Sequence, residues 1–239
     1  MAKEILQIMF KKRQPPQVLY FESSAGFPED LFKPANRVVP NWYKEMPRFV
    51  PGLDGPKTTS VKHCIPFVDA LTTGYMLLTP VDIYIEQTPE GPIGRWNSQT
   101  PVLDERPHGQ TGKMPAPPGC DDKHFLWVTQ TAVELPDGYS LICIHPINRT
   151  DLPFVTTGGI VDGPFVMHGG NFPFHIKKGF EGLIPQGTPF MQVIPFNRTD
   201  WVAKKKDGVY MAGVESTRTE DYHQGSWYRR KKWHRKSYK

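Results

Sequence analysis

Residues 132–196 read AVELPDGYSLICIHPINRTDLPFVTTGGIVDGPFVMHGGNFPFHIKKGFEGLIPQGTPFMQVIPF. Short apolar runs in this stretch are separated by groups such as Pro-Asp-Gly, Gly-Gly-Asn and Pro-Gln-Gly. Groups of this kind form turns that neither a helix nor a central strand accommodates. Apolar residues do not recur at helical spacing for long enough to compete. The stretch therefore predicts a core of short, consecutive strands.

The composition of the chain agrees with this reading. Of its 239 residues, 25 are proline and 21 are glycine, which favours short strands and long ordered loops over helices. No apolar run approaches the roughly 20 residues that span a bilayer. The N-terminal sequence MAKEILQIMFKKR has its basic cluster after the apolar run, unlike a secretory signal. We therefore expect a cytoplasmic protein with no membrane association.

Cysteine and histidine offer little support for a metal site. Cys64, Cys120 and Cys143 are widely spaced and form no CxxC pair, so we expect reduced thiols. His168 and His175 could meet Asp162 on neighbouring strands, but the sequence has no HxH or HxD strand motif. We therefore predict no metal site.

Three regions follow from the order of these features along the chain. Residues 1–60 predict an initial strand at 3–10 and then a proline-rich and aromatic wrap over the core, with a short helix near Asn41–Glu45. Residues 61–201 form the predicted β core. Its strands include Tyr75–Leu78, Val81–Glu86 and Phe125–Gln130, and residues 88–122 form a long loop. Residues 202–239 form a C-terminal arm.

The basic excess of the chain is concentrated in that arm. The net charge is +5, and seven Lys and Arg residues without an acid lie between positions 229 and 239, so the remainder is close to neutral. Aromatic residues interleave with these cations, a combination that suits single-stranded nucleic acid. The candidate contacts for nucleic acid or another anion are Arg229, Arg230, Lys231, Lys232, Trp233 and Arg235. Alternatively, the arm docks its aromatic side chains on a neighbouring subunit and leaves its charges in solvent.

Four motifs between residues 68 and 196 occur in a recognisable order. They are Ala70-Leu-Thr-Thr-Gly-Tyr-Met-Leu77, Leu135-Pro-Asp-Gly-Tyr-Ser-Leu-Ile-Cys-Ile144, Gly159-Ile-Val-Asp162 and Ile184-Pro-Gln-Gly-Thr-Pro-Phe-Met-Gln-Val-Ile194. In order and spacing they resemble the motifs of the trimeric dUTPase and dCTP deaminase family. The chain is also similar, over His63–Tyr75 and Gly138–Pro195, to an uncharacterised family of proteins from tailed bacteriophages.

The first resemblance implies a fold and an assembly. The fold would be mainly β, a dUTPase-like β-clip that forms a distorted barrel similar to a jelly roll, with the proline-rich N-terminal wrap and the basic C-terminal arm added to it. The family forms homotrimers whose sites lie between subunits. Asp162 matches the catalytic aspartate of the family, although Asp-Gly-Pro is also ordinary turn chemistry.

Departures from the family motifs fall on the reactive residues. Met76 stands where the family has an aspartate near its metal, and a thioether does not replace a carboxylate for a hard cation. His145 and Pro146 replace an arginine–serine pair that binds phosphate. Arg149 follows closely and could reach a phosphate, or it is a solvated surface arginine. The residues that shape the fold persist, which favours a retained fold without catalysis.

We therefore predict a non-catalytic, phage-like β-clip protein with a structural or binding role as a homotrimer, in the virion or the host cytoplasm. One alternative is a nucleotide pyrophosphatase or deaminase with divergent motifs, which would need Mg²⁺ if it hydrolyses nucleotides. Another is a nucleic-acid-binding accessory protein that acts through the tail. Otherwise no cofactor is expected. Asp162 is the candidate catalytic residue, and the candidate ligand-binding residues are Arg149, Tyr75, Asp69, His145 and Gln192.

Overall fold

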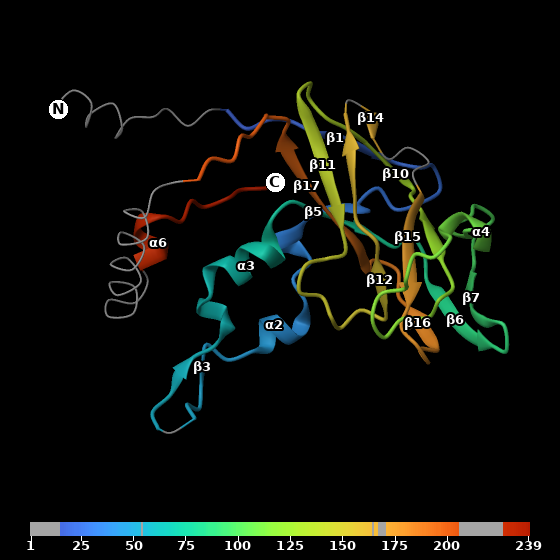
Figure 1. Ribbon diagram of the computed structural model, residues 1–239, viewed down its shortest axis with the longest axis horizontal. Coiled ribbons are helices and arrows are strands. Elements are labelled where there is room, and N and C mark those ends of the chain that lie inside the picture. The colour runs from blue at the N-terminus through green and yellow to red at the C-terminus, as the bar shows by residue number, and fades with distance from the viewer. Residues whose placement is uncertain (1–14, 54, 164, 167–170, 206–226) are drawn as a thin grey trace.

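The computed structural model describes residues 15–53, 55–163, 165–166, 171–205 and 227–239. Its central feature is a five-stranded antiparallel sheet (Figure 1). The strand order is β13 (Gly159–Asp162), β11 (Tyr139–Ile144), β17 (Pro189–Asn197), β5 (Tyr75–Leu78) and β2 (Phe32–Pro34). All four sequence motifs therefore contribute adjacent strands to one sheet.

The central strand β17 is buried on both faces, because five consecutive residues from Pro189 to Val193 are inaccessible. Met191 and Val193 belong to the main apolar core, whereas Gln192 points to the opposite face. In the neighbouring strand β5, Leu77 packs into the main core and Met76 packs into a smaller cluster. The sheet thus separates two apolar clusters.

A four-stranded sheet packs against the main core. It contains β12 (Phe154–Thr156), β15 (Asn171–Ile176), β9 (Phe125–Val128) and β8 (Leu103–Glu105). Trp127 of β9 stacks on Phe174 with ring centroids 3.8 Å apart and donates from Nε1 to Thr156 Oγ1 at 3.1 Å. The Thr156 hydroxyl donates in turn to the carbonyl of Phe190 in β17 at 2.7 Å. This chain of contacts joins the two sheets.

Three smaller sheets complete the β structure. They are β1 (Tyr20–Ser23) with β10 (Thr131–Glu134) and β14 (Phe165–Val166); β16 (Gly182–Ile184) with β6 (Ile83–Thr88) and β7 (Gly91–Trp96); and β3 (Phe49–Val50) with β4 (Thr58–Thr59). The predicted mainly β class is confirmed. Within the described ranges the strands form separate antiparallel sheets and do not close into one barrel.

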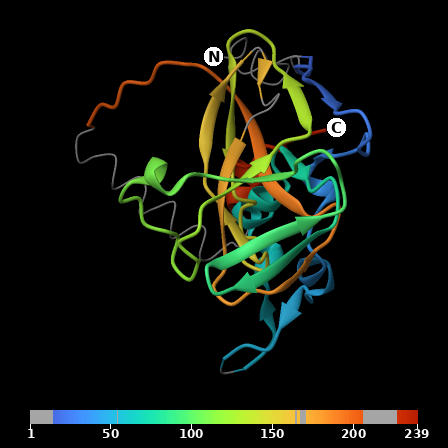
Figure 2. The ribbon, with the colours of Figure 1, turned by 90° about the vertical axis from the view of Figure 1, so that its right-hand side faces the viewer.

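Residues 88–122 differ from the predicted long loop. They contain β7, β8 and the short helix α4 (His108–Thr111), and β7 forms a hairpin with β6 that Figure 2 shows in front. Part of the proline and glycine content that favoured a loop belongs to this hairpin, in which Pro89 and Glu90 form the turn and Thr88 pairs with Gly91. Gly91 takes φ +104°, and Pro92 is tolerated because β7 is an edge strand.

The N-terminal region is part of the sheets as well as a cover for them. β1 pairs with β10, and β2 pairs with β5. The predicted helix is confirmed as α2 (Asn41–Glu45), and it follows the short 3-10 helix η1 (Ala35–Arg37). The predicted strand at residues 3–10 lies outside the described residues.

The remaining helices of the described ranges are η2 (Val61–His63), α3 (Ile65–Thr72) and α6 (Trp227–Lys231). Sequence analysis did not predict α3, whose eight residues are too few for a periodic pattern. Pro66 lies in its first turn, where a missing N–H costs nothing.

The cysteines form no disulfide. Cys64 is exposed, whereas Cys120 and Cys143 are buried. Burial raises the pKa of the Cys143 thiol to about 12, so this side chain stays protonated at physiological pH.

A pair of buried imidazoles lies at the end of the four-stranded sheet. His124 stacks on His175 with ring centroids 4.7 Å apart, and both His124 ring nitrogens lack a hydrogen-bond partner among the described residues. Burial lowers the pKa of His124, and the neighbouring His175 and Arg106 lower it further. His124 is therefore held in its neutral form.

The close approach of β5 to β17 predicts a strict requirement for glycine at position 74. Gly74 has φ +74°, and a Cβ there would lie 2.2 Å from the Val193 carbonyl oxygen. Gly26 has φ +86° with nothing within 4 Å, so Gly26→Ala should cost only about 1–2 kcal/mol for the left-handed backbone. Gly74→Ala should cost at least about 2 kcal/mol more in denaturant unfolding. Equal losses in the two variants would contradict this packing.

The buried imidazole pair predicts acid sensitivity. The unfolded chain takes up a proton at His124 near pH 6.5, whereas the folded protein does so only at lower pH. The free energy of unfolding should therefore fall as the pH drops below about 6.5. His124→Phe keeps a ring against His175 and removes the titrating group, so its loss should be smaller. Denaturant unfolding over a pH series tests this, and parallel curves for the two proteins would contradict it.

Candidate functional site

Gln192 lies at the centre of the predicted ligand-binding residues and is completely buried. Its amide nitrogen donates to the carbonyls of Ala70 at 2.9 Å and Thr73 at 2.7 Å, at the end of α3. Its amide oxygen accepts from the backbone N–H of Ile147 at 2.8 Å. The side chain thus ties α3 and the loop after β11 to the central strand.

His145 holds the same loop. Its Nδ1 accepts from the backbone N–H of Thr156 at 3.2 Å, so Nε2 carries the proton and donates to the Arg149 carbonyl at 3.2 Å. Burial is the main cause of its lowered pKa. The bond to the Arg149 carbonyl opposes this effect, Lys177 and the Arg149 charge add to it, and Asp151 opposes it. His145 is therefore neutral and orders the loop that carries Arg149.

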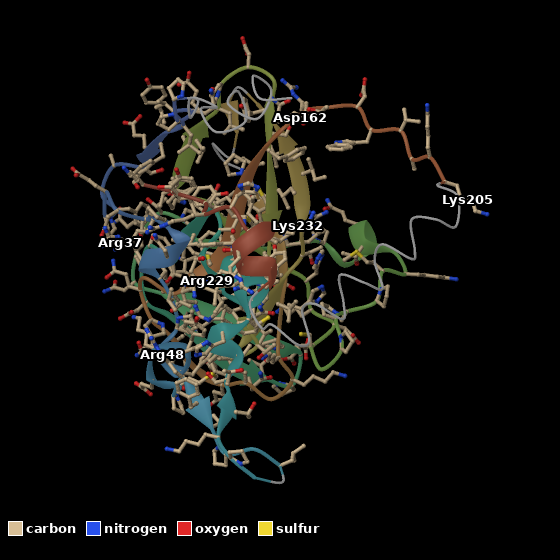
Figure 3. All side chains as sticks on the ribbon, turned by 90° about the vertical axis from the view of Figure 1, so that its left-hand side faces the viewer. Arg37, Arg48, Asp162, Lys205, Arg229 and Lys232 are labelled. Carbon is tan, nitrogen blue, oxygen red and sulfur yellow. The ribbon has the colours of Figure 1, made fainter. Side chains whose placement is uncertain are left out.

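Asp162 lies apart from these residues. It is exposed at the end of β13, an edge strand, and accepts a hydrogen bond from the Ser140 hydroxyl at 2.6 Å. Figure 3 places Asp162 near the top of the view, whereas Arg37 lies lower at its left-hand edge. Asp162 is not among the residues that line the cavity beside Arg149.

Asp69 and Tyr75 receive the C-terminal segment of the same chain. Asp69 accepts from Trp233 Nε1 at 3.0 Å and from Lys236 Nζ at 2.5 Å. Tyr238 meets the Tyr75 ring edge-on, with centroids 5.6 Å apart. Trp233 and Tyr238 are thus engaged on α3 and β5.

Most of the cations in the segment are exposed. Arg229, Arg230, Lys232 and Arg235 are exposed, and Lys231 lies with the first two in α6. Figure 3 shows Arg229 and Lys232 on the face that looks away from the sheets. The contacts differ from the expected docking on a neighbouring subunit, because Trp233 and Tyr238 pack on their own chain while Arg229, Arg230 and Arg235 remain exposed.

An open cavity of about 830 Å³ forms where four chain segments meet. We call it the basic groove. One wall comes from residues 37–44, and the others come from residues 149–153, 177–180 and 183–189. Five cations and one acid line it: Arg37, Lys44, Arg149, Lys177, Lys178 and Asp151.

The charge of Asp151, the one acid among the lining residues, is compensated by Arg149. Arg149 is buried and binds Asp151 through Nε and Nη2, both at 2.9 Å from the carboxylate. Burial alone would raise the pKa of Asp151, but the hydrogen bonds from Arg149 and Trp42 and the Arg149 charge lower it overall. Asp151 thus remains ionised and compensates Arg149.

The remaining cations set the potential of the groove. Lys177 donates to the Thr150 carbonyl at 2.5 Å and forms no ion pair with an acid among the described residues. Arg37, Lys44 and Lys178 are exposed and make no ion pair within the part of the chain that the structure describes. The groove is therefore suited to hold an anion.

Sequence analysis placed only Arg149 in this group. Arg37, Lys44, Lys177 and Lys178 come from distant parts of the chain, and only Lys177-Lys178-Gly179 forms a recognisable basic turn. No cluster of three or more His, Cys, Asp or Glu suited to a metal ion occurs among the described residues.

Comparison with known proteins finds distant likeness to solved structures alone. No protein-family model matches the sequence, and neither does any curated protein. Among solved structures, the fold is similar to that of a point mutant of the dUTPase from phage phi11 of S. aureus, a structure that describes coordination of a structural Mg(II) ion. The identity is 14%, the match covers 56% of this chain and 82% of that chain, and the TM-score is 0.29. The overlap is loose, so function has to follow from the residues of this chain.

Proposed function

We propose that the chain is a non-catalytic binding protein whose basic groove takes a ligand with several phosphate groups. The convergence of five cations and one compensated carboxylate on an open cavity carries this proposal. Cations fixed around one cavity repel one another, and a bound polyanion relieves that repulsion. Phosphate groups match both the forked guanidinium of arginine and the point charge of lysine.

The geometry of the four sequence motifs supports binding over catalysis. Hydrolysis of a nucleoside triphosphate needs a group that positions water beside the phosphate-binding cations. Asp162 does not line the basic groove, and Asp151 is occupied by Arg149 and Trp42. A pyrophosphatase or deaminase site would require Asp162, Arg149 and residues 69–75 to meet. Within one chain, Gln192 joins the loop that carries Arg149 to the end of α3, whereas Asp162 lies apart at the end of the edge strand β13.

The order of the motifs supports a β-clip framework of the kind found in phage proteins, assembled as a homotrimer. The four motif strands are neighbours in one sheet. Its outer strand β13 exposes Ile160 (68% accessible), and an apolar edge strand suits contact with a further copy. We place this assembly in the host cytoplasm or the virion. None of the helices described is long and apolar enough to cross a bilayer.

The docked tail supports a smaller role for the basic arm. Trp233 donates to Asp69 and Tyr238 packs edge-on against Tyr75, so both side chains already have partners within the chain. Arg229, Arg230 and Arg235 would then add general electrostatic attraction for a polyanion.

The proposal predicts binding of a phosphodiester chain without turnover of nucleotides. An abasic oligomer of about ten phosphates should bind in low salt. The triple variant Arg37→Gln, Lys44→Gln, Lys178→Gln should bind it more weakly, with the slope of log K against log salt smaller by about 2. Each dNTP incubated with the protein and Mg²⁺ should release neither pyrophosphate nor ammonia.

Two controls sharpen this test. Lys113→Gln removes an exposed lysine that follows α4 and does not line the groove, so its affinity should match that of the wild type. Sedimentation equilibrium on the same sample should give the mass of three chains. Turnover that disappears in Asp162→Asn would contradict the proposal, as would equal salt slopes for the triple variant and the wild type. A one-chain mass would remove the homotrimer.

A further inference from the structure

A second, aromatic cavity adjoins the basic groove. It has a volume of about 480 Å³ and is lined by Trp42, Phe67, Asn148, Thr150 and Asp151. Asp151 also lines the basic groove, so the two cavities meet at this residue. We call the second cavity the aromatic shelf.

The rings of the shelf are held in fixed orientations. Trp42 donates from Nε1 to Asp151 at 3.2 Å and meets the Phe67 ring edge-on, with centroids 6.4 Å apart. Tyr43 stacks behind Phe67, with centroids 6.3 Å apart, and Lys62 lies over the Tyr43 ring. Because the indole N–H and the carboxylate satisfy each other, the shelf is prepared before any ligand arrives.

Polar groups stand at the rim of the shelf. Asn148 has φ 60°, a left-handed conformation that asparagine tolerates, and with Thr150 it lines the cavity opposite the rings. Neither side chain makes a hydrogen bond within the described residues. An amide and a hydroxyl can donate to and accept from the edge of a planar ligand.

From this juxtaposition we infer that the site binds single-stranded nucleic acid, with a base on Trp42 and Phe67 and the adjacent phosphates in the basic groove. The inference rests on the proposed function and adds a binding surface for a nucleic-acid base. An aromatic surface beside a cationic groove is the combination by which single strands are bound, because every base has a face to stack. A duplex keeps its base faces stacked on one another and cannot use the shelf. The groove is open, so a chain can continue beyond it.

The test compares three labelled oligomers of equal length, about ten residues: oligothymidylate, oligouridylate and an abasic phosphodiester. Fluorescence anisotropy should show that the thymidylate or uridylate strand binds roughly tenfold more tightly than the abasic strand. The comparison of the thymidylate strand with the uridylate strand shows whether the site prefers DNA or RNA. Trp42→Leu and Phe67→Leu should each remove the preference for bases and leave abasic binding within about twofold.

Control variants keep the outcomes distinct. Trp42→Phe retains a ring and should keep most of the preference. Trp201→Leu removes an aromatic side chain that is 90% accessible and outside both cavities, and it should change nothing. Phe67→Leu leaves the Trp42–Asp151 bond intact, so its result is decisive if Trp42→Leu is misfolded. Equal binding of all three oligomers would overturn the inference and leave the proposed function standing, whereas failure of the abasic strand to bind would overturn both. A preference for bases that survives in folded Phe67→Leu would also overturn the inference.

Discussion

One buried amide fixes the geometry on which both cavities depend. Gln192 stands on the central strand, and its three hydrogen bonds reach the end of α3 and the first residues of the loop after β11. Leaving any one of these backbone groups unpaired in the interior would lower the free energy of unfolding by about 1–3 kcal/mol. The position of the loop therefore follows from the identity of a single side chain in β17.

The loop passes this constraint on to the site. His145 binds the Thr156 amide after the loop and the Arg149 carbonyl within it. The charges of Arg149 and Asp151 then compensate each other at the groove wall. Trp42 binds the same carboxylate from the other side and thereby joins the aromatic shelf to the groove. Candidate site residues such as Gln192 and His145 thus stabilise the loop. The groups that a ligand would contact are the surrounding cations that form no ion pair among the described residues.

The sequence was sufficient to predict those parts of the fold that depend on local patterns. Turn residues and short apolar runs identified β5, β11, β13 and β17, and a short helix was expected where α2 lies. The same proline and glycine signals suggested a loop at residues 88–122, because a two-residue turn with Gly91 looks the same in sequence as irregular chain. The eight residues of α3 were too few to show helical spacing.

The site was much harder to predict, and the reason is physical. Gln192 and His145 were singled out as polar residues near family motifs, but their partners are backbone groups, which no sequence pattern reveals. Arg37 and Lys44 belong to no motif, and both lie more than a hundred positions before the basic turn that contains Lys178. They become a site only when the sheets bring their loops together.

Amide hydrogen exchange at Ile147 in the wild type and in Gln192→Leu tests the role of this buried amide most directly. The account predicts that the Ile147 amide is protected in the wild type and loses protection by roughly tenfold or more in the variant, while the ladder amides of β11 and β17 remain protected. Unchanged protection at Ile147, with the rest of the sheet intact, would contradict it.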